Sequence, residues 1–529
     1  MSEPAARKRP GWLDRVERAG NALPDPTTLF VLGALLVLVG AELAVQLDWS
    51  VEKTVTQVGT GPAGEPVQER VQVEVRPTRL LSGDGIFWIL KTLVTNFTGF
   101  PPLGVVLVGM LGIGVAERSG FIGALLKGLL LAVPDRLLTP TVFFVGVMSS
   151  MGLDAGYVVL PPVAAALYQA VGRSPLVGLG AVFAGVSAGF SANLFITSLD
   201  PLLSELSTSS AQLLDPAYVV TADANWWFMI ASTVLLTGVG WAVTAWWVEP
   251  RMARREAASD GAADTPAAPD DAMAGPLTAP ERRGLVFAVG AAAAATGLFA
   301  LASVLPGWPL HGDDGPFPRW VRVIVPLLFL VFLLPGVVYG AVTGRIRNDK
   351  DVASMMGETM ASMGSYLVLA FFAGQFIAWF AYTGLGEMLA ISGGRALAAA
   401  RLPPALLMVG FIGVVAVGNL FIGSMSAKYA FFAPVFVPMF MQTGIAPELT
   451  QAAYRVGDSV SNVITPLNPY VVILLAFMQR YAKDAGIGTL VALMLPYALV
   501  FGVIWSALLV AWVVLGVPLG PHGALVYTP

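Results

Sequence analysis

Two long apolar blocks, at residues 85–248 and about 358–516, constrain the fold more than any other feature of the sequence. Each is far longer than the roughly 20 apolar residues that a helix needs to cross about 30 Å of hydrocarbon. Charged residues make up only 12% of the chain, about half the usual share of a soluble domain. A soluble chain this apolar could not cover its surface with polar groups. The sequence therefore predicts an all-α polytopic membrane protein.

Positive charges set the expected orientation, because Lys and Arg stay on the cytoplasmic side. Five of them precede the first apolar run at 28–47, and more flank the segments near 249–283 and 345–350. The N-terminus is then cytoplasmic and the C-terminus extracytoplasmic. Each apolar block crosses an odd number of times, the first from outside to inside and the second from inside to outside.

The loop after the first apolar run predicts a small extracytoplasmic β-hairpin. Residues 51–58 and 67–75 alternate apolar and polar side chains around a Gly- and Pro-containing turn. The predicted order of segments is a cytoplasmic N-terminus (1–27), a first transmembrane helix (28–47), the hairpin loop (48–84), repeat 1 (85–248) with a re-entrant hairpin near 142–167, a cytoplasmic linker (249–283), two transmembrane helices (284–343), repeat 2 (344–516) with a re-entrant hairpin near 409–441, and an extracytoplasmic C-terminus (517–529).

The two apolar blocks share an internal repeat. Residues 155–187 align without a gap to 427–459, and the match pairs Gly with Gly and Pro with Pro at fixed spacing. After a four-residue slip, Ile196–Pro201 aligns with Ile464–Pro469. Similar sequence inserted with opposite polarity is an inverted repeat, an architecture characteristic of secondary transporters.

Each repeat carries a polar, glycine-containing segment between two short apolar runs, at 149–156 and at 418–428. Straight spanning helices do not contain such segments. Non-helical backbone at membrane depth is tolerated only where protein or a water-filled cavity surrounds it. We expect two re-entrant hairpins, and about nine transmembrane helices in all.

Downstream of each hairpin, Pro residues predict interrupted helices, because Pro removes a backbone donor and clashes with the preceding turn. The freed carbonyls and nearby Ser, Thr and Asn oxygens suit a hard cation such as Na⁺, and the half-helix N-termini could face an anionic substrate group. The candidate Na⁺ ligands are Asn193, Thr197, Ser461, Asn462 and Thr465.

Ionisable residues inside the apolar blocks are costly and stand out. Arg455 and Asp458 lie three apart, hence on one helix face, either as a structural ion pair or as a substrate-carboxylate clamp with a coupling carboxylate. Asp200 occupies the repeat position of Asn468 and could instead cap a broken helix. Asp154 and Lys428, at the hairpin tips, could be exposed at the interface or contact a ligand. Tyr429 could stack on an aromatic ligand or simply pack.

Several classes of function are disfavoured. The chain has no Cys, and its two His lie outside the apolar runs, which leaves no thiol nucleophile and makes a His metal site improbable. There is no Gly-Lys-Ser/Thr phosphate loop, so ATP is an improbable energy source. The net charge of −4 gives no indication of nucleic-acid binding. An ion-gradient-driven transporter is favoured, with an ion channel or an aspartate-based intramembrane enzyme as alternatives.

The segment Gly418–Tyr470 resembles the p-aminobenzoyl-glutamate transporter (AbgT) family in long motifs, among them Gly-Ser-Met-Ser-Ala-Lys and Asn-Val-Ile-Thr-Pro-Leu-Asn-Pro-Tyr. Leu23–Pro26, Asp154–Val159 and Phe190–Pro201 support the resemblance, which covers nearly the whole chain.

The resemblance implies a bowl-shaped homodimer in a bacterial inner membrane. It also implies Na⁺- or H⁺-coupled movement of folate-related p-aminobenzoyl compounds, or export of sulfonamide antimetabolites, without enzymatic activity. Where the family commonly has Trp, this chain has Tyr429. The transport residues that the motifs carry over are Asp200, Ser426, Tyr429, Pro447, Arg455, Asp458 and Pro466.

Overall fold

Helices dominate the computed structural model, which describes residues 26–60, 66–131, 134–152, 155–258, 276–315, 317–419, 422–465, 468, 470–483 and 485–528. Among these residues, seven helical segments are long and apolar enough to cross a membrane: Thr27–Gln46, Gly83–Arg118, Trp226–Arg254, Ala279–Val304, Ile324–Thr343, Gly364–Tyr382 and Gly488–Leu515. Shorter apolar helices accompany them. The prediction of an all-α polytopic membrane protein is confirmed.

The first half of the chain holds the β-hairpin and repeat 1. Its elements are α2 (Pro26–Gln46), β1 (Val51–Thr60), β2 (Pro66–Val75), α3 (Gly83–Thr98), α4 (Pro101–Arg118), α5 (Phe121–Leu131), η1 (Asp135–Leu137), α6 (Leu138–Met148), η2 (Ser149–Gly152), α7 (Ala155–Ala170), α8 (Pro175–Ala188), α9 (Leu199–Ala211), α10 (Trp226–Val243), η3 (Thr244–Val248) and α11 (Glu249–Ala258).

The second half holds two linking helices and repeat 2. Its elements are α12 (Ala279–Val304), β3 (Asp313–Asp314), β4 (Phe317–Pro318), α13 (Arg319–Arg322), α14 (Ile324–Thr343), α15 (Asp349–Ser362), α16 (Gly364–Tyr382), α17 (Leu385–Ala399), α18 (Pro404–Gly418), α19 (Met425–Met441), α20 (Pro447–Ser461), α21 (Tyr470–Tyr481) and α22 (Ile487–Leu515).

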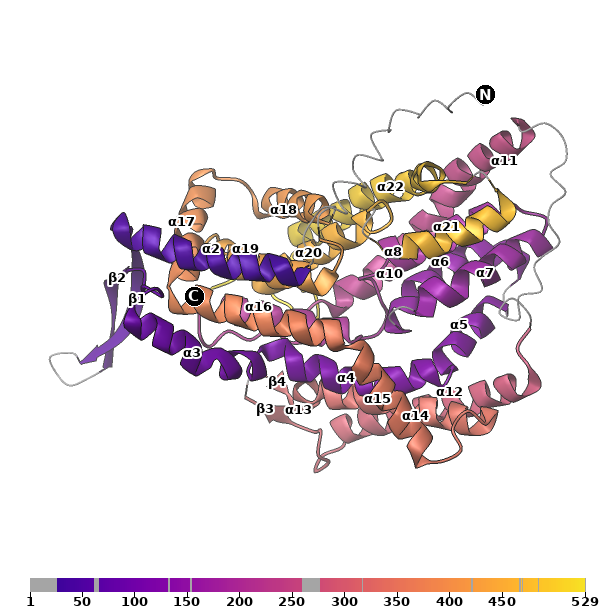
Figure 1. Ribbon diagram of the computed structural model, residues 1–529, viewed down its shortest axis with the longest axis horizontal. Coiled ribbons are helices and arrows are strands. Elements are labelled where there is room, and N and C mark those ends of the chain that lie inside the picture. Colours follow the sequence, from indigo (N-terminus) through magenta and orange to yellow (C-terminus); the bar gives the residue numbers. More distant parts are fainter. Residues whose placement is uncertain are drawn as a thin grey trace, which may run out of the picture.

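The predicted β-hairpin is present. Strands β1 and β2 pair antiparallel, with Val51 opposite Val75, and they lie at the left end of the molecule beyond α2 and α3 (Figure 1). Val51 is buried with Met388 and Ile391 of α17, so one end of the hairpin is anchored on the helical body.

The internal repeat has a counterpart in the backbone. Gly172 and Gly444, which the alignment pairs, both adopt a left-handed conformation, with φ of 73° and 80°. Each is followed by the Pro that begins the next helix, Pro175 for α8 and Pro447 for α20. Glycine enters the left-handed region without steric cost, and Pro suits the first helical turn. The same local chemistry therefore turns the chain at the same point of both repeats.

Two helical hairpins form the centre of the two repeats. In repeat 1, α6 and α7 both contact α8; in repeat 2, α18 and α19 both contact α20. Figure 1 shows α6 and α7 in the right half of the molecule and α18 and α19 in the left half. The hairpins thus reach the middle from opposite ends, as the inverted repeat predicts. Asp154 in the first tip lies outside the described residues.

Helix α4 is packed closely against its neighbours through small residues. A Cβ at Gly112 would lie 2.2 Å from the backbone oxygen of Phe329 in α14, and one at Gly336 would lie 2.7 Å from Ala116. Such close backbone approach is typical of membrane helix pairs. Helix α4 also packs against α9, the helix that carries Asp200.

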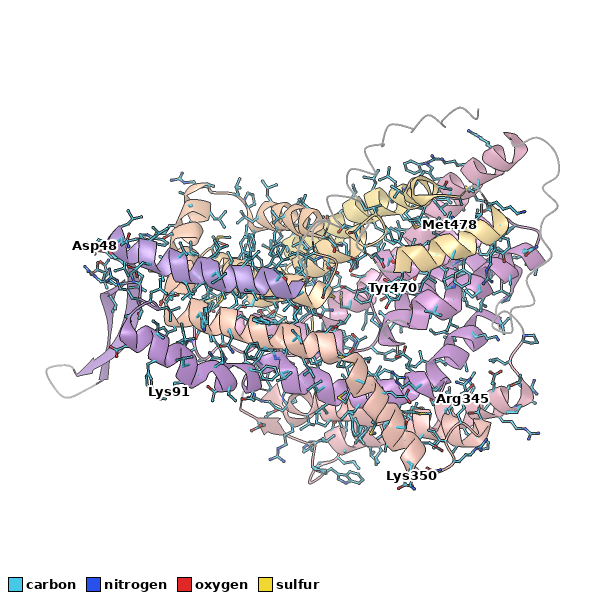
Figure 2. All side chains as sticks on the ribbon, in the orientation of Figure 1. Asp48, Lys91, Arg345, Lys350, Tyr470 and Met478 are labelled. Atoms are coloured by element: carbon cyan, nitrogen blue, oxygen red, sulfur yellow. The ribbon has the colours of Figure 1, made fainter. Side chains whose placement is uncertain are left out.

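Charged residues mark the two ends of the molecule. Asp48 lies at the end that carries the β-hairpin, and Arg345 and Lys350 lie toward the other end (Figure 2). The expected placing of the N-terminus inside and the C-terminus outside stays a prediction. Most of the expected N-terminal segment (1–27) and residues 259–275 of the linker lie outside the described part of the chain.

Candidate functional site

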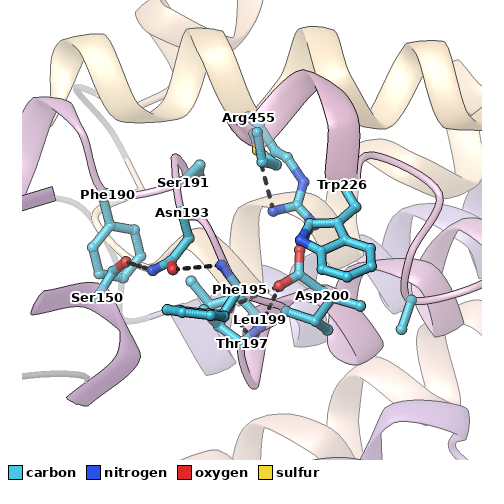
Figure 3. Close-up of a pocket in the computed structure, with 13 residues that line it drawn as sticks. Ser150, Phe190, Ser191, Asn193, Phe195, Thr197, Leu199, Asp200, Trp226 and Arg455 are labelled. Carbon is cyan, nitrogen blue, oxygen red and sulfur yellow. Dashed lines mark hydrogen bonds and ion pairs between the residues drawn. The ribbon is translucent and has the colours of Figure 1, made fainter. Parts of the chain in front are cut away.

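The chain is unwound between α8 and α9, and this segment is tied to the first hairpin. Asn193 donates from Nδ2 to the Oγ of Ser150 in the hairpin tip at 2.9 Å, and its own Oδ1 accepts from the backbone N–H of Phe195 at 3.1 Å (Figure 3). Trp226 of α10 donates to the carbonyl of Leu194 at 2.9 Å. These bonds satisfy polar groups that an interrupted helix leaves without backbone partners.

Asp200 begins α9 and makes two kinds of contact. Its Oδ2 accepts hydrogen bonds from the backbone N–H of Thr197 at 2.6 Å and from the Thr197 hydroxyl at 2.9 Å. Its Oδ1 accepts from Nη2 of Arg455 at 2.6 Å (Figure 3). Asp200 therefore ties the unwound segment before α9 to the first turn of that helix, and it is the ionic partner of an arginine in repeat 2. The N-cap of α9 is Ser198, so the interpretation of Asp200 as a helix cap is wrong.

Arg455 has donors left over after it pairs with Asp200. The residue is 2% exposed. Its Nη1 reaches only the sulfur of Met229 at 3.8 Å, and its Nε has no hydrogen-bond partner among the described residues. The hydroxyl of the nearby Ser191 is also buried without one. Because buried polar groups are nearly always paired, these atoms mark a place where a polar ligand group fits.

These side chains line a small central cavity, whose walls include Ser191, Asn193, Asp200, Trp226 and Arg455 (Figure 3). Its volume is about 10 Å³, which is room for roughly one water molecule. In this conformation the centre of the protein is closed around the ion pair.

A second buried ion pair lies in repeat 2. Lys428 of α19 and Asp458 of α20 are 2.6 Å apart, with side chains that are 0% and 1% exposed. A structural ion pair between Arg455 and Asp458, one of the two interpretations of the sequence, is therefore wrong. Arg455 pairs with Asp200, and Asp458 pairs with Lys428. Interfacial exposure of Lys428, one of the two interpretations of the sequence, is wrong, because the tip is covered by protein.

Asn419, at the end of α18, is the centre of the polar cluster around this pair. Its Oδ1 accepts from Lys428 at 2.5 Å, and its Nδ2 lies within 2.9 Å of oxygens of Asp458, Ser461 and Asn462. Thr465 donates to the Asn419 carbonyl at 2.9 Å. The sequence analysis missed Asn419. Its one available signal was an Asn directly after Gly418 where an apolar helix ends.

The five candidate Na⁺ ligands fall into two groups. Ser461, Asn462 and Thr465 gather around Asn419. Asn193 and Thr197 lie with Asp200 in the other repeat. We call these the Asn419 cluster and the Asp200 cluster. Both are rich in the neutral and anionic oxygens that hard cations bind.

The charge pair of repeat 2 has no charged counterpart in repeat 1. The alignment places Gly156 opposite Lys428 and Val186 opposite Asp458. A Cβ at Gly156 would lie 3.5 Å from Val186 and 2.2 Å from the hydroxyl of Ser149. The same hairpin–helix contact is thus uncharged in one repeat and ionic in the other.

The remaining predicted site residues are Ser426, Tyr429, Pro447 and Pro466. Tyr429 is fully buried, with its hydroxyl 2.6 Å from the Ser207 hydroxyl and its ring 4.4 Å from that of Tyr454. It packs in this conformation. Ser426 lines a separate cavity beside Ser198, and Pro447 begins α20. Pro466 lies outside the described residues.

Comparison with known proteins places the chain among transporters. The family model described as "AbgT putative transporter family" matches residues 11–527. The p-aminobenzoyl-glutamate transport protein of Escherichia coli (strain K12) is 35% identical over 519 residues, which cover 97% of this chain and 96% of that protein.

Two solved structures share the fold. The Alcanivorax borkumensis YdaH transporter, described as having an unusual topology, is 42% identical with a TM-score of 0.83, covering 94% of this chain and 100% of that one. Neisseria gonorrhoeae MtrF, described as illuminating a class of antimetabolite efflux pumps, is 41% identical with a TM-score of 0.86, covering 97% and 100%. These relatives are transport proteins and not enzymes.

Proposed function

This chain belongs to the AbgT family of transporters, and from that premise we propose that it is a secondary active transporter of anionic p-aminobenzoyl compounds driven by a Na⁺ or H⁺ gradient. p-Aminobenzoyl-glutamate is the substrate named for the Escherichia coli relative. We place the protein in a bacterial inner membrane as a homodimer, with its N-terminus in the cytoplasm and its C-terminus in the periplasm.

The observation that carries this proposal is the buried ion pair between Arg455 and Asp200. A guanidinium offers a planar set of donors that matches a carboxylate. Asp200 uses part of that set, and Nε is left without a partner in the described structure. An incoming substrate carboxylate can replace Asp200 as the partner of the guanidinium. Asp200 then keeps its hydrogen bonds from Thr197. The substrate carboxylate brings one more anion into the buried site, and Asp200 loses the positive charge that had paired with it.

Ion coupling is proposed at the two polar clusters. Asp458 in the Asn419 cluster and Asp200 in the Asp200 cluster are the carboxylates within reach of the candidate Na⁺ ligands. Once substrate has displaced Asp200 from Arg455, that carboxylate needs a new counter-charge. A Na⁺ ion or a proton supplies it, which links substrate binding to ion binding.

Export of sulfonamide antimetabolites fits the same site. Sulfonamides share the para-substituted aniline ring of p-aminobenzoyl compounds, and the similar Neisseria gonorrhoeae protein is described with a class of antimetabolite efflux pumps. The direction of net flux follows from the imposed gradients, so one site serves import and export.

Reconstituted transport tests the proposal. Proteoliposomes are given labelled p-aminobenzoyl-glutamate or a sulfonamide, with Na⁺ and pH gradients imposed separately. We expect flux to follow at least one gradient and to be lost in Arg455→Ala. Arg173→Ala is the matched control, because Arg173 forms its ion pair with Glu249 at 2.7 Å, well outside the central cavity. Undiminished flux in Arg455→Ala refutes the site, and ionic current beyond carrier turnover favours a channel.

A further inference from the structure

Two larger chambers lie on either side of the central cavity. The first, of about 290 Å³, has Glu117 and Arg118 at the end of α4, Tyr366 of α16 and Ser426 of α19 in its wall; we call it the Arg118 chamber. The second, of about 360 Å³, has Gly104 near the start of α4, Glu205 of α9 and Arg322 in its wall; we call it the Arg322 chamber. Both approach or reach the size of pockets that hold drug-sized ligands, about 300–1,000 Å³.

The central cavity shares a lining residue with each chamber. Leu199 lines both the central cavity and the Arg118 chamber. Ala222 lines both the central cavity and the Arg322 chamber. Leu199 is 8% exposed, and it is the chain neighbour of Asp200. Each chamber therefore borders the cavity that holds the Arg455–Asp200 pair at one shared residue.

Helix α9 passes between the two chambers. Ser198, Leu199 and Leu202 face the Arg118 chamber, whereas Pro201, Ser204 and Glu205 face the Arg322 chamber. The spacing within each set is that of one helix face. Asp200 lies between the two faces and holds Arg455. Movement of the first turn of α9 therefore changes access from both sides at once.

The chambers border different faces of α4. The Arg322 chamber touches Gly104, Val105 and Val108. The Arg118 chamber touches Val106 and Met110 and extends to Glu117 and Arg118 at the other end of the helix. Together the two chambers follow roughly 20 Å of α4, from Gly104 to Arg118, at 1.5 Å of rise per residue.

Buried polar atoms without hydrogen-bond partners occur in the Arg118 chamber and in the central cavity. They are the hydroxyl of Tyr366 in the Arg118 chamber and, in the central cavity, Ser191 Oγ and Arg455 Nε, each without a hydrogen-bond partner among the described residues. Unpaired buried groups are rare and call for a ligand or water. They are distributed over two neighbouring cavities and do not form a single cluster.

We infer that the Arg118 chamber, the central cavity and the Arg322 chamber are successive stations of one permeation path, with Leu199 as the barrier on one side of Arg455 and Ala222 as the barrier on the other. The inference rests on the proposed transport function. Both chambers combine apolar walls with one acidic and one basic side chain, Glu117 with Arg118 and Glu205 with Arg322, so the path suits amphipathic solutes. The preference for an anion comes from Arg455 in the central cavity. Leu199 acts as a gate and does not bind the substrate carboxylate.

Thiol accessibility tests the path, because the chain contains no Cys and so has no background reactivity. Met229→Cys is the reporter, since Met229 lines the central cavity and is 3% exposed. Ser362→Cys and Val219→Cys mark the Arg118 and Arg322 chambers. An impermeant maleimide is applied to spheroplasts and, separately, to inverted membrane vesicles, so that it reaches one face at a time.

Leu199→Ala in the reporter background is expected to raise the rate of Met229→Cys labelling about tenfold, and only from the face that labels Ser362→Cys. Leu202→Ala is the matched control, because Leu202 lines the same chamber but not the central cavity. If the Leu199→Ala protein does not insert into the membrane, Leu199→Val, which removes less of the side chain, is used in its place. Conversely, Ala222→Phe is expected to slow labelling from the face that labels Val219→Cys.

Equal labelling rates for Leu199 and Leu202 variants overturn the inference, as does acceleration from the Arg322 face. These measurements need no substrate. If labelling is as expected but no p-aminobenzoyl compound is transported, the path is supported and the proposed function is wrong. If transport is normal but both variants label at the same rate, the proposed function is supported and the path is wrong.

Discussion

Arg455 of α20 donates to Asp200 of α9 at 2.6 Å, although the two residues are 255 positions apart in the chain. The pair joins the first turn of α9 in repeat 1 to the middle of α20 in repeat 2. Because it is buried, removing either member leaves a charge without compensation, while removing both does not. This asymmetry lets stability and transport be measured separately.

Asp200→Asn is expected to lower the free energy of unfolding by about 3–5 kcal/mol, the usual loss when a buried ion pair loses one partner. The double variant Asp200→Asn/Arg455→Met is expected to recover most of that stability and still to lack transport. Thermal unfolding in detergent and flux in proteoliposomes give the two readouts. A double variant no more stable than the single one contradicts the pairing.

Lys428→Met leaves Asp458 buried and alone, so we expect a comparable loss of stability. Adding Asp458→Asn is expected to restore folding, with substrate binding retained and the dependence of flux on the ion gradient lost. The measurement is substrate binding by calorimetry beside gradient-driven flux. Gradient dependence that survives in the double variant excludes Asp458 as a coupling group.

Variants in the two polar clusters distinguish which cluster binds Na⁺. Asn419→Ala removes the residue that connects Lys428, Ser461 and Asn462, whereas Asn193→Ala disturbs only the repeat 1 segment. We expect Asn419→Ala to raise the Na⁺ concentration for half-maximal flux at least about tenfold, which corresponds to roughly 1.4 kcal/mol. Asn193→Ala is expected to shift it less. The reverse order would assign the ion to the Asp200 cluster.

Tyr429 offers a test of packing against ligand stacking. Tyr429→Phe removes the hydrogen bond to Ser207 and keeps the ring, at an expected loss of about 1 kcal/mol in stability with flux little changed. Tyr429→Trp forces a larger ring into a fully buried position and is expected to lose about 1–3 kcal/mol. A Trp variant that gains both stability and flux would show that the ring faces the substrate.

Gly172 and Gly444 form a matched pair across the repeats. Both have positive φ, and a Cβ at either would meet no atom closer than 3.9 Å. Substitution by Ala therefore adds backbone strain without a clash, about 1–2 kcal/mol at each position. We expect equal losses of thermal stability in Gly172→Ala and Gly444→Ala. Unequal losses would mean that one turn relaxes where the other cannot.

The sequence predicted those features that depend on local chemistry. The paired Gly and Pro residues, the broken hairpin helices and the β-hairpin all follow from the conformations their own residues allow. The sequence did not predict which residues pair across long distances in the chain. Arg455 and Asp458 share a helix face, so an ion pair between them was one of two interpretations of the sequence. The packing of α9 and α19 against α20 gives each of them a different partner. Nothing in the sequence distinguished Asn419 from an ordinary residue at the end of a helix.

The unequal hairpin contacts divide the work between the halves of the molecule. Where Gly156 meets Val186, neither residue carries a charge, so neither a bound ion nor the membrane voltage acts on the contact directly. Where Lys428 meets Asp458, both residues are charged and buried, so the contact responds to a nearby ion and to the membrane voltage. Besides Asp200, the residues of α18–α21 are therefore the place to look for variants with a different driving ion.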